Sequence, residues 1–93
     1  MYELTITEDL KDYLKEVRKA LKQKGYTLKR SKCRRKIGYM QLNYDIEYWF
    51  KNNIMIEFEI DNNNNTLEVM FHFSDNGERR FKKILLSEVL EMI

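Results

Sequence analysis

The sequence predicts a two-layer α+β domain in which an antiparallel meander of three or four strands packs on an N-terminal helix, with a further helix at the C-terminus. Three observations predict this class: apolar residues recur at helical spacing over residues 8–24, they alternate with polar residues over 40–74, and asparagines separate the alternating runs. The chain has 93 residues, so residues 1–93 are expected to form one domain.

Residues 8–24 carry both the start and the stop signals of a helix. Thr7 is a favourable N-cap, acidic residues follow it at the positive end of the helix, and lysines crowd the last turn before Gly25. One face collects the apolar residues Leu10, Leu14, Val17 and Leu21. We expect this face to pack on the sheet.

Three runs with a period of two predict consecutive antiparallel strands. They cover residues 40–50, 54–60 and 67–73, and a short strand over 26–30 is expected to precede them, followed by a loop over 31–36. In each long run every second residue is apolar, and the residues between them are mostly polar. One face of the sheet is therefore predicted to be buried and the other to be solvated.

Placing all apolar residues on one face predicts the strand register. Phe50 then pairs with Ile54 across a three-residue loop, and Ile60 pairs with Leu67. This register puts five carboxylates on the outer face, with the first, fourth and fifth in one row. They are Asp45, Glu47, Glu57, Glu59 and Glu68.

The C-terminal segment has two interpretations. Asn76-Gly77 is a typical hairpin turn, but a hairpin there would pair Phe73 with Arg80 and move Phe81 to the polar face. We therefore favour a helix that starts at Asp75, and the choice between strand and helix over 78–86 stays open.

The net charge of +2 conceals a strong separation of charge along the chain. Residues 11–36 hold twelve basic side chains and two carboxylates, whereas residues 37–78 hold eight carboxylates and one lysine. Ten basic side chains of the helix and of the segment after it are candidates for binding nucleic acid or an acidic protein. The ten are Lys11, Lys15, Arg18, Lys22, Lys29, Arg30, Lys32, Arg34, Arg35 and Lys36.

The predicted acidic row has three interpretations. It can be a solvated face, a surface for a cationic protein partner, or, least favoured, the metal site of a nuclease that uses Asp45, Glu57, Glu59 and Glu68. Trp49 is odd-numbered, like the polar residues of its run, so it too is predicted to lie on the outer face. There it and Tyr39 could form an exposed aromatic anchor, unless the C-terminal helix covers Trp49.

Catalytic and cofactor motifs are not found in the sequence. Cys33 and His72 are the single cysteine and the single histidine, and there is neither a glycine-rich phosphate loop nor a Ser/His/Asp set. We therefore expect a protein that is not an enzyme and holds no cofactor and no metal. With no apolar run near the about 20 residues of a membrane span and no signal pattern, a cytoplasmic location is expected.

The function that the sequence favours is that of a small interaction protein with opposed basic and acidic faces. It would bind or block a larger nucleic-acid-handling assembly, in its most specific form as a phage or mobile-element inhibitor of the anti-CRISPR type. The frequent use of Lys, Asn, Ile, Tyr and Phe, which AT-rich codons encode, suggests a low-GC bacterium or one of its phages as the source. The alternative is a module that binds nucleic acid directly through residues 11–36. The chain is expected to be a monomer or a homodimer.

Overall fold

A computed structural model describes all residues from 1 to 93 and shows two helices and six strands. The strands form one antiparallel sheet, so the predicted α+β class is confirmed, with six strands in place of three or four. In chain order the elements are β1 (Leu4–Thr5), α1 (Glu8–Gln23), β2 (Thr27–Ile37), β3 (Met40–Lys51), β4 (Ile54–Asp61), β5 (Thr66–Asp75), β6 (Glu78–Ile84) and α2 (Leu86–Met92).

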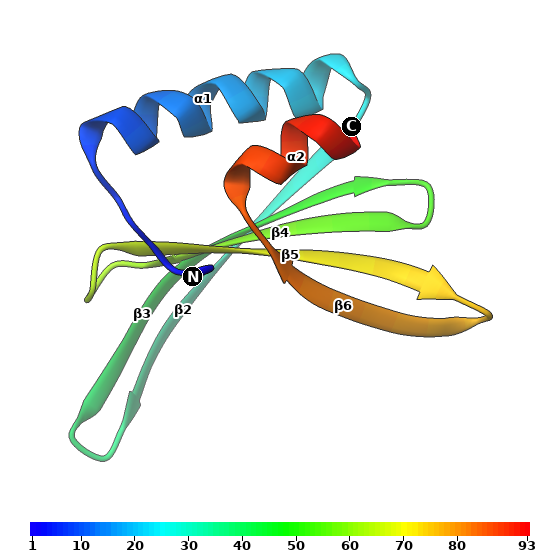
Figure 1. Cartoon of the computed structure of the whole chain (residues 1–93). Helices are drawn as coiled ribbons and strands as arrows, with labels where there is room; N and C mark the ends of the chain where they lie inside the picture. Colours follow the sequence, from blue (N-terminus) through cyan, green and yellow to red (C-terminus); the bar gives the residue numbers. More distant parts are fainter.

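Both helices lie on the same face of the sheet (Figure 1). We call this the inner face and the opposite one the outer face. The strand order is β1-β5-β4-β3-β2. β6 pairs with the same edge of β5 as β1 does, but further along that strand. The core lies between the helices and the sheet. It consists of Leu14, Val17, Leu21, Trp49, Ile56, Phe58, Leu67, Val69, Ile84, Leu86 and Val89.

The predicted N-terminal helix is confirmed. The side chain of Thr7 accepts a hydrogen bond from the backbone N–H of Leu10 at 3.1 Å, as an N-cap does. At the other end Gly25 has a φ of +89°, which an L-residue rarely adopts. The helix buries Leu14, Val17 and Leu21, the centre of the predicted apolar stripe.

The predicted loop over 31–36 is wrong, because β2 continues without a break to Ile37. Two of its basic residues lie beside one carboxylate of β3: Lys32 is directly opposite Asp45, and Arg34 forms an ion pair with Asp45 at 2.8 Å. Opposite charges on paired residues stabilise a sheet. A tight turn at Gly38, where φ is +61°, then returns the chain into β3.

The predicted register between β3 and β4 is also wrong, by one residue. Asn52-Asn53 forms a two-residue turn in place of three, so Lys51 pairs with Ile54 and Trp49 with Ile56. A slip of one residue turns every side chain of a strand to the other face. In β3 the odd-numbered residues, including Asp45 and Glu47, therefore face the helices.

The register between β4 and β5 is confirmed. Ile60 pairs with Leu67 and Phe58 with Val69, so the apolar residues of both strands share the inner face. The same register places Glu59 directly opposite Glu68 on the outer face, as the sequence predicts.

The favoured helix starting at Asp75 is wrong, since residues 78–84 form β6. Asn76 and Gly77 have φ values of 51° and 81°, and this left-handed pair makes a tight hairpin turn. Phe73 does pair with Arg80, and the side chain of Phe81 is 64% exposed on the outer face. The C-terminal helix is present but shorter, as α2. Neither helix is long and apolar enough to cross a membrane.

The inverted strand β3 leads to a prediction about its two aromatic neighbours, Trp49 and Tyr48. Trp49 is fully buried under the helices, so Trp49→Ala should cost about 3–5 kcal/mol of unfolding free energy, whereas Tyr48→Ala on the outer face should cost well under half of that. Urea titration measures both. A larger cost for Tyr48→Ala would contradict the register.

The fluorescence of the single tryptophan gives a test that needs no substitution. Because Trp49 has no exposed surface, its emission should be blue-shifted and resistant to acrylamide quenching in the folded protein. Emission at the wavelength of free tryptophan would place the ring on the outer face and contradict the structure.

Candidate functional site

A partly buried ion pair joins α1 to β3. Arg18 donates from Nε to Oε1 of Glu47 at 3.0 Å and from Nη2 to Oε2, so the contact is bidentate. Glu47 is only 5% exposed, and its Oε1 also accepts the indole N–H of Trp49 at 3.1 Å. The expectation that Glu47 lies on the exposed outer face is therefore wrong.

A second polar contact joins the same helix and strand. Lys51, four residues after Glu47 and on the same face of β3, donates to the carbonyl oxygen of Lys24 at 2.6 Å and lies 5.6 Å from the centre of the Tyr26 ring. A cation at the C-terminal end of a helix is favourable. The inner face of β3 thus contributes one anion and one cation that hold α1 in place.

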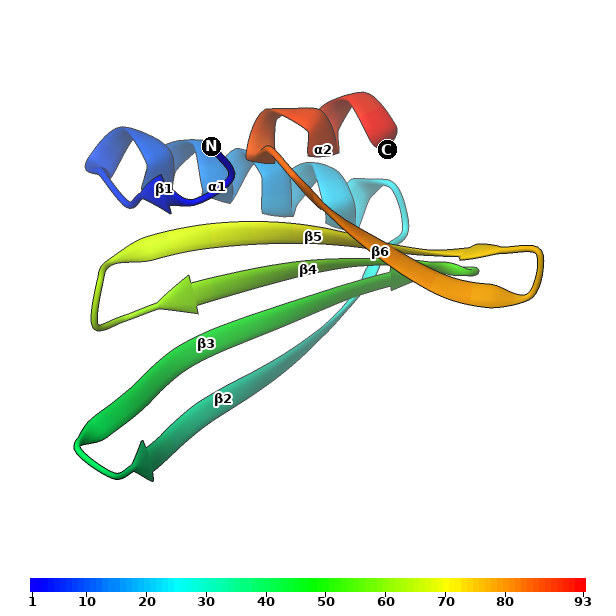
Figure 2. The same ribbon diagram turned by 60° about the horizontal axis from the view of Figure 1, so that its bottom comes forward.

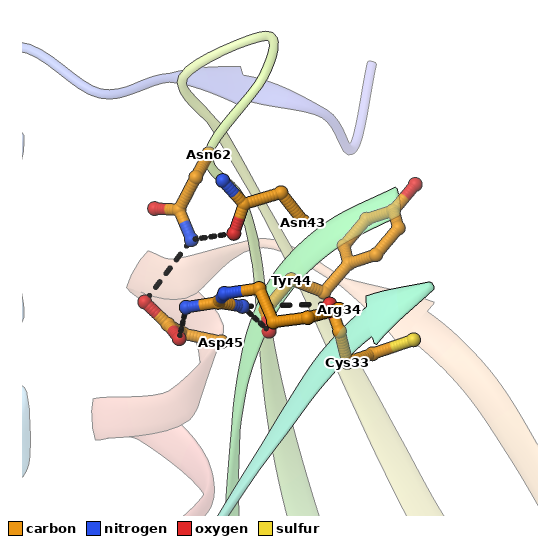
Figure 3. Close-up of polar contacts among 6 residues, drawn as sticks. All are labelled: Cys33, Arg34, Asn43, Tyr44, Asp45 and Asn62. Atoms are coloured by element: carbon orange, nitrogen blue, oxygen red, sulfur yellow. Dashed lines mark hydrogen bonds and ion pairs between the residues drawn. The ribbon is translucent and has the colours of Figure 1, made fainter. Parts of the chain in front are cut away.

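Asp45, the other displaced carboxylate, joins three segments on the inner face. It accepts from Nη2 of Arg34 at 2.8 Å and from the side-chain amide of Asn62 at 3.1 Å, and that amide also donates to Asn43 (Figure 3). The hydrogen bonds from Arg34 and Asn62 lower the pKa of Asp45 below its usual value. Arg34 donates in addition to the carbonyl oxygen of Tyr44 at 2.7 Å.

Beyond this network β2 and β3 continue as a two-stranded arm, residues 34–43. β4 pairs with β3 only as far as Tyr44, and the arm projects away from the helices (Figure 1). Its tip is apolar and open: Tyr39 is fully exposed, and Ile37 and Met40 are 57% and 66% exposed. Tyr39 of the predicted aromatic anchor is therefore accessible, whereas Trp49 is buried and cannot take part.

The structure brings most of the predicted basic residues onto one surface. Even-numbered bases of β2 lie on the inner face, and Arg18 extends toward them from α1, with a depression of about 260 Å³ between Arg18, Arg30 and Lys32. The helical neighbours of Arg18 in its stripe follow the same side of α1. We call this set the basic surface: Lys11, Lys15, Arg18, Lys22, Arg30, Lys32, Arg34 and Lys36. Lys29 and Arg35 lie on the outer face instead, since their strand partners are Tyr48 and Leu42.

Most of the basic surface is free of internal partners. Three of its members form ion pairs: Arg18 with Glu47, Arg34 with Asp45, and Lys11 with Glu8. The other five carry exposed charges without an ion pair. They are Lys15, Lys22, Arg30, Lys32 and Lys36.

The acidic cluster of the outer face is smaller than predicted. Glu57, Glu59 and Glu68 lie there, whereas Asp45 and Glu47 do not. Glu57 contacts His72 at 2.9 Å and Glu68 contacts Lys83 at 3.3 Å, which leaves Glu59 between two carboxylates without a cation of its own. Burial, Glu57 and Glu68 raise the pKa of Glu59.

The carboxylates proposed for a metal nuclease are divided between the two faces, with Asp45 on the inner one. No group of three His, Cys, Asp or Glu side chains is placed to hold a metal ion. The geometry therefore gives the metal interpretation no support.

Sequence reasoning missed the apolar residues of the outer face. Tyr44, Ile46, Tyr48 and Phe50 all point there from β3, and Figure 3 shows the Tyr44 ring and the Cys33 sulfur directed away from Asp45. The sequence does contain a signal for these residues. β3 carries the large apolar Trp49 between Tyr48 and Phe50, so apolar side chains must point to both faces of the strand. A strand that is apolar on both faces is typical of burial on both sides.

Comparisons with known proteins find no relative: no family model matches the chain, and neither the curated proteins nor the solved structures give a significant match.

The ion pair between Arg18 and Glu47 leads to a prediction of stability. Arg18→Met should cost about 3–5 kcal/mol because it leaves a buried carboxylate without its cation, whereas Arg18→Met combined with Glu47→Gln should recover much of that loss. Lys22→Met, one turn later on the same stripe, is the matched control and should be nearly neutral. A Lys22→Met variant as unstable as Arg18→Met would contradict the role of the pair.

The acidic cluster leads to a prediction about pH. The pKa of Glu59 is raised above 4.5, so its ionised form destabilises the folded state at neutral pH and this cost disappears as pH falls below the unfolded value. Glu59→Gln should therefore stabilise the protein by a few tenths to about 1 kcal/mol at about pH 7 and by nothing at about pH 4. Thermal unfolding at low protein concentration measures this, with Glu16→Gln on α1 as control. A gain that is equal at both pH values would show that charge is not its cause.

Proposed function

We propose that this protein binds nucleic acid through the phosphate backbone, using the basic surface and the arm. The observation that supports this most strongly is the convergence of α1 and β2, which collects five unpaired cations on one side of the molecule while the nearby carboxylates Asp45 and Glu47 are each neutralised by an arginine. Unpaired Lys and Arg side chains bind phosphates and release condensed counterions, which is the main source of affinity for nucleic acid.

The geometry of β2 suits a regular polyanion. Arg30, Lys32, Arg34 and Lys36 alternate along one strand, so neighbouring cations are separated by two residues, or roughly 6.8 Å along the strand. That spacing is close to the separation of successive phosphates along one nucleic-acid strand. The depression beside this row is lined by Asp45 and Glu47 as well as by basic residues, and each of these carboxylates is paired with an arginine, so a phosphate backbone can lie along it.

The arm supports the same proposal. A two-stranded ribbon is narrow enough to enter the major groove of a duplex, and exposed apolar side chains at the tip of such an element can contact or separate bases. Here the tip presents Ile37, Tyr39 and Met40, and the strand behind it carries Arg35 and Lys36. Tyr39 is also able to stack on the unpaired bases of a single strand.

This proposal takes up the alternative that the sequence offers and leaves the opposed-face inhibitor in second place. The reason is that the acidic side of the molecule loses Asp45 and Glu47 to the inner face, where they pair with arginines. An acidic protein partner remains the competing ligand for the same cations.

Fluorescence anisotropy over a salt series tests the proposal with labelled duplex and single-stranded oligonucleotides. If the five unpaired cations of the basic surface contact phosphates, the plot of log affinity against log salt should have a slope of about −4 to −5 for a duplex. The replacement Arg30→Gln with Lys32→Gln should reduce the magnitude of this slope by about two and weaken binding at low salt.

The matched control removes two charges from the other end of the sheet, by Arg79→Gln with Lys82→Gln on β6. Both residues are exposed and form no ion pair, so this variant should bind like the parent protein. Absence of binding to either oligonucleotide at low salt would overturn the proposal and leave an acidic protein as the ligand of the basic surface. Equal losses in both variants would show nonspecific attraction without a site.

A further inference from the structure

The strand β3 has its more apolar side turned away from the core. Its outer-face residues from 40 to 50 are all apolar, whereas Asp45 and Glu47 point toward the helices. Of these, Tyr44, Ile46 and Tyr48 are only half-buried and Phe50 is 39% exposed. A sheet with one solvated face normally shows the reverse arrangement, apolar inside and polar outside.

Neighbouring strands extend this apolar strip. Met55 of β4, Met70 of β5 and Phe81 of β6 lie on the same face, and the Phe81 ring stands 5.7 Å from that of His72. Both helices lie on the other side of the sheet (Figure 2), so no part of the chain covers the strip. Contiguous exposed apolar surface of this kind marks an interaction site.

Charges of opposite sign flank the strip. On the β2 side lie Lys29 and Arg35, and on the β4 and β5 side lie Glu57, Glu59 and Glu68. The register puts Lys29, Tyr48 and Glu57 in one row across three strands. Lys29 and Glu59 have no ion-pair partner within the chain.

We propose that the outer face is a homodimer interface, in which the β3 strands of two copies face each other across a two-fold axis that runs parallel to them. Such an axis places β2 of each copy over β4 of the other, so Lys29 meets Glu57 of the second copy and lies within a lysine's reach of Glu59. Two-fold packing about an axis across the strands would instead put β4 on β4 and carboxylate on carboxylate. The charge pattern therefore selects one of the two arrangements.

The size of the strip is adequate for a dimer. Four strands spaced by about 4.8 Å and eight residues rising by about 3.4 Å each span roughly 19 Å by 27 Å. This area is roughly 510 Å² on each copy, or about 1,000 Å² for the pair, which reaches the lower limit for a biological interface. Two antiparallel sheets can pack face to face in this way with their strands nearly aligned.

A second copy also fits this face better than a nucleic acid does. The outer-face side chains of β4 and β5 include four carboxylates that would repel phosphates, namely Asp61 together with Glu57, Glu59 and Glu68. The four cations Lys29, Arg35, Arg79 and Lys83 balance them, so the face as a whole is neutral and complementary to itself. The apolar strip shares only Met40 and Leu42 with the arm, and the basic surface lies on the other side of the sheet, so this inference does not depend on the proposed function.

Sedimentation velocity and light scattering over a wide range of protein concentrations test the dimer. The unaltered chain should reach twice its monomer mass, and Ile46→Glu, at the centre of the strip, should keep it monomeric while circular dichroism shows the fold unchanged. A charge swap tests the axis without altering the apolar strip. Lys29→Glu alone and Glu57→Lys alone should each weaken dimerisation by tenfold or more, and the double variant should restore it.

Lys15→Glu on the exposed side of α1 makes the same charge reversal away from the strip and should leave the dimer unchanged. A chain that stays monomeric at every concentration would overturn the inference, as would an Ile46→Glu variant that is folded and still dimeric. Dimers that survive both single charge reversals would exclude the proposed axis. Protection of Tyr44 and Tyr48 by an oligonucleotide, with no dimer formed, would assign the face to nucleic acid instead.

Discussion

The bidentate contact between Arg18 and the buried Glu47 is the interaction on which the arrangement of this molecule depends. A carboxylate under a helix layer is tolerated only when a cation and further hydrogen-bond donors satisfy it, and here Arg18 and the Trp49 indole do so. The contact sets the face of β3 that meets α1. Once Glu47 points inward, Trp49 enters the core and Tyr48 and Phe50 must point outward.

This orientation of β3 also separates carboxylates that would otherwise repel each other. In the register that buries only apolar residues, Asp45 and Glu47 would stand opposite Glu59 and Glu57 on one face. In the observed register they lie on the other face, where Arg34 and Arg18 neutralise them. The basic surface keeps its unpaired cations because only two of its arginines are used in this way. Stability and the proposed nucleic-acid binding therefore depend on the same pair of internal ion pairs.

Two predictions failed for one physical reason. The predicted register of β3 against β4, and the preference for a helix starting at Asp75 over a hairpin, both rest on the rule that large apolar residues share the buried face, which would exclude Phe50 and Phe81 from the outer face. Tight turns at Asn52-Asn53 and Asn76-Gly77 enforce the observed registers, and Asn52, Asn76 and Gly77 adopt the left-handed backbone that such turns require. The rule assumes that the outer face of the sheet is polar. Here the outer face is itself apolar, as the proposed dimer interface would be, so the rule does not apply.

Local patterns in the sequence determined α1 with its Thr7 cap, the positions of β4 and β5 and their register, and the concentration of bases in residues 11–36, because each depends on neighbours in the chain. Tertiary structure alone decided which side of β3 meets the helices, that residues 31–37 extend β2 into an arm, and which bases share a surface. These features depend on contacts between residues far apart in sequence, above all Arg18 with Glu47 and Arg34 with Asp45. The alternating pattern of a strand specifies its two faces but not which of them will be buried.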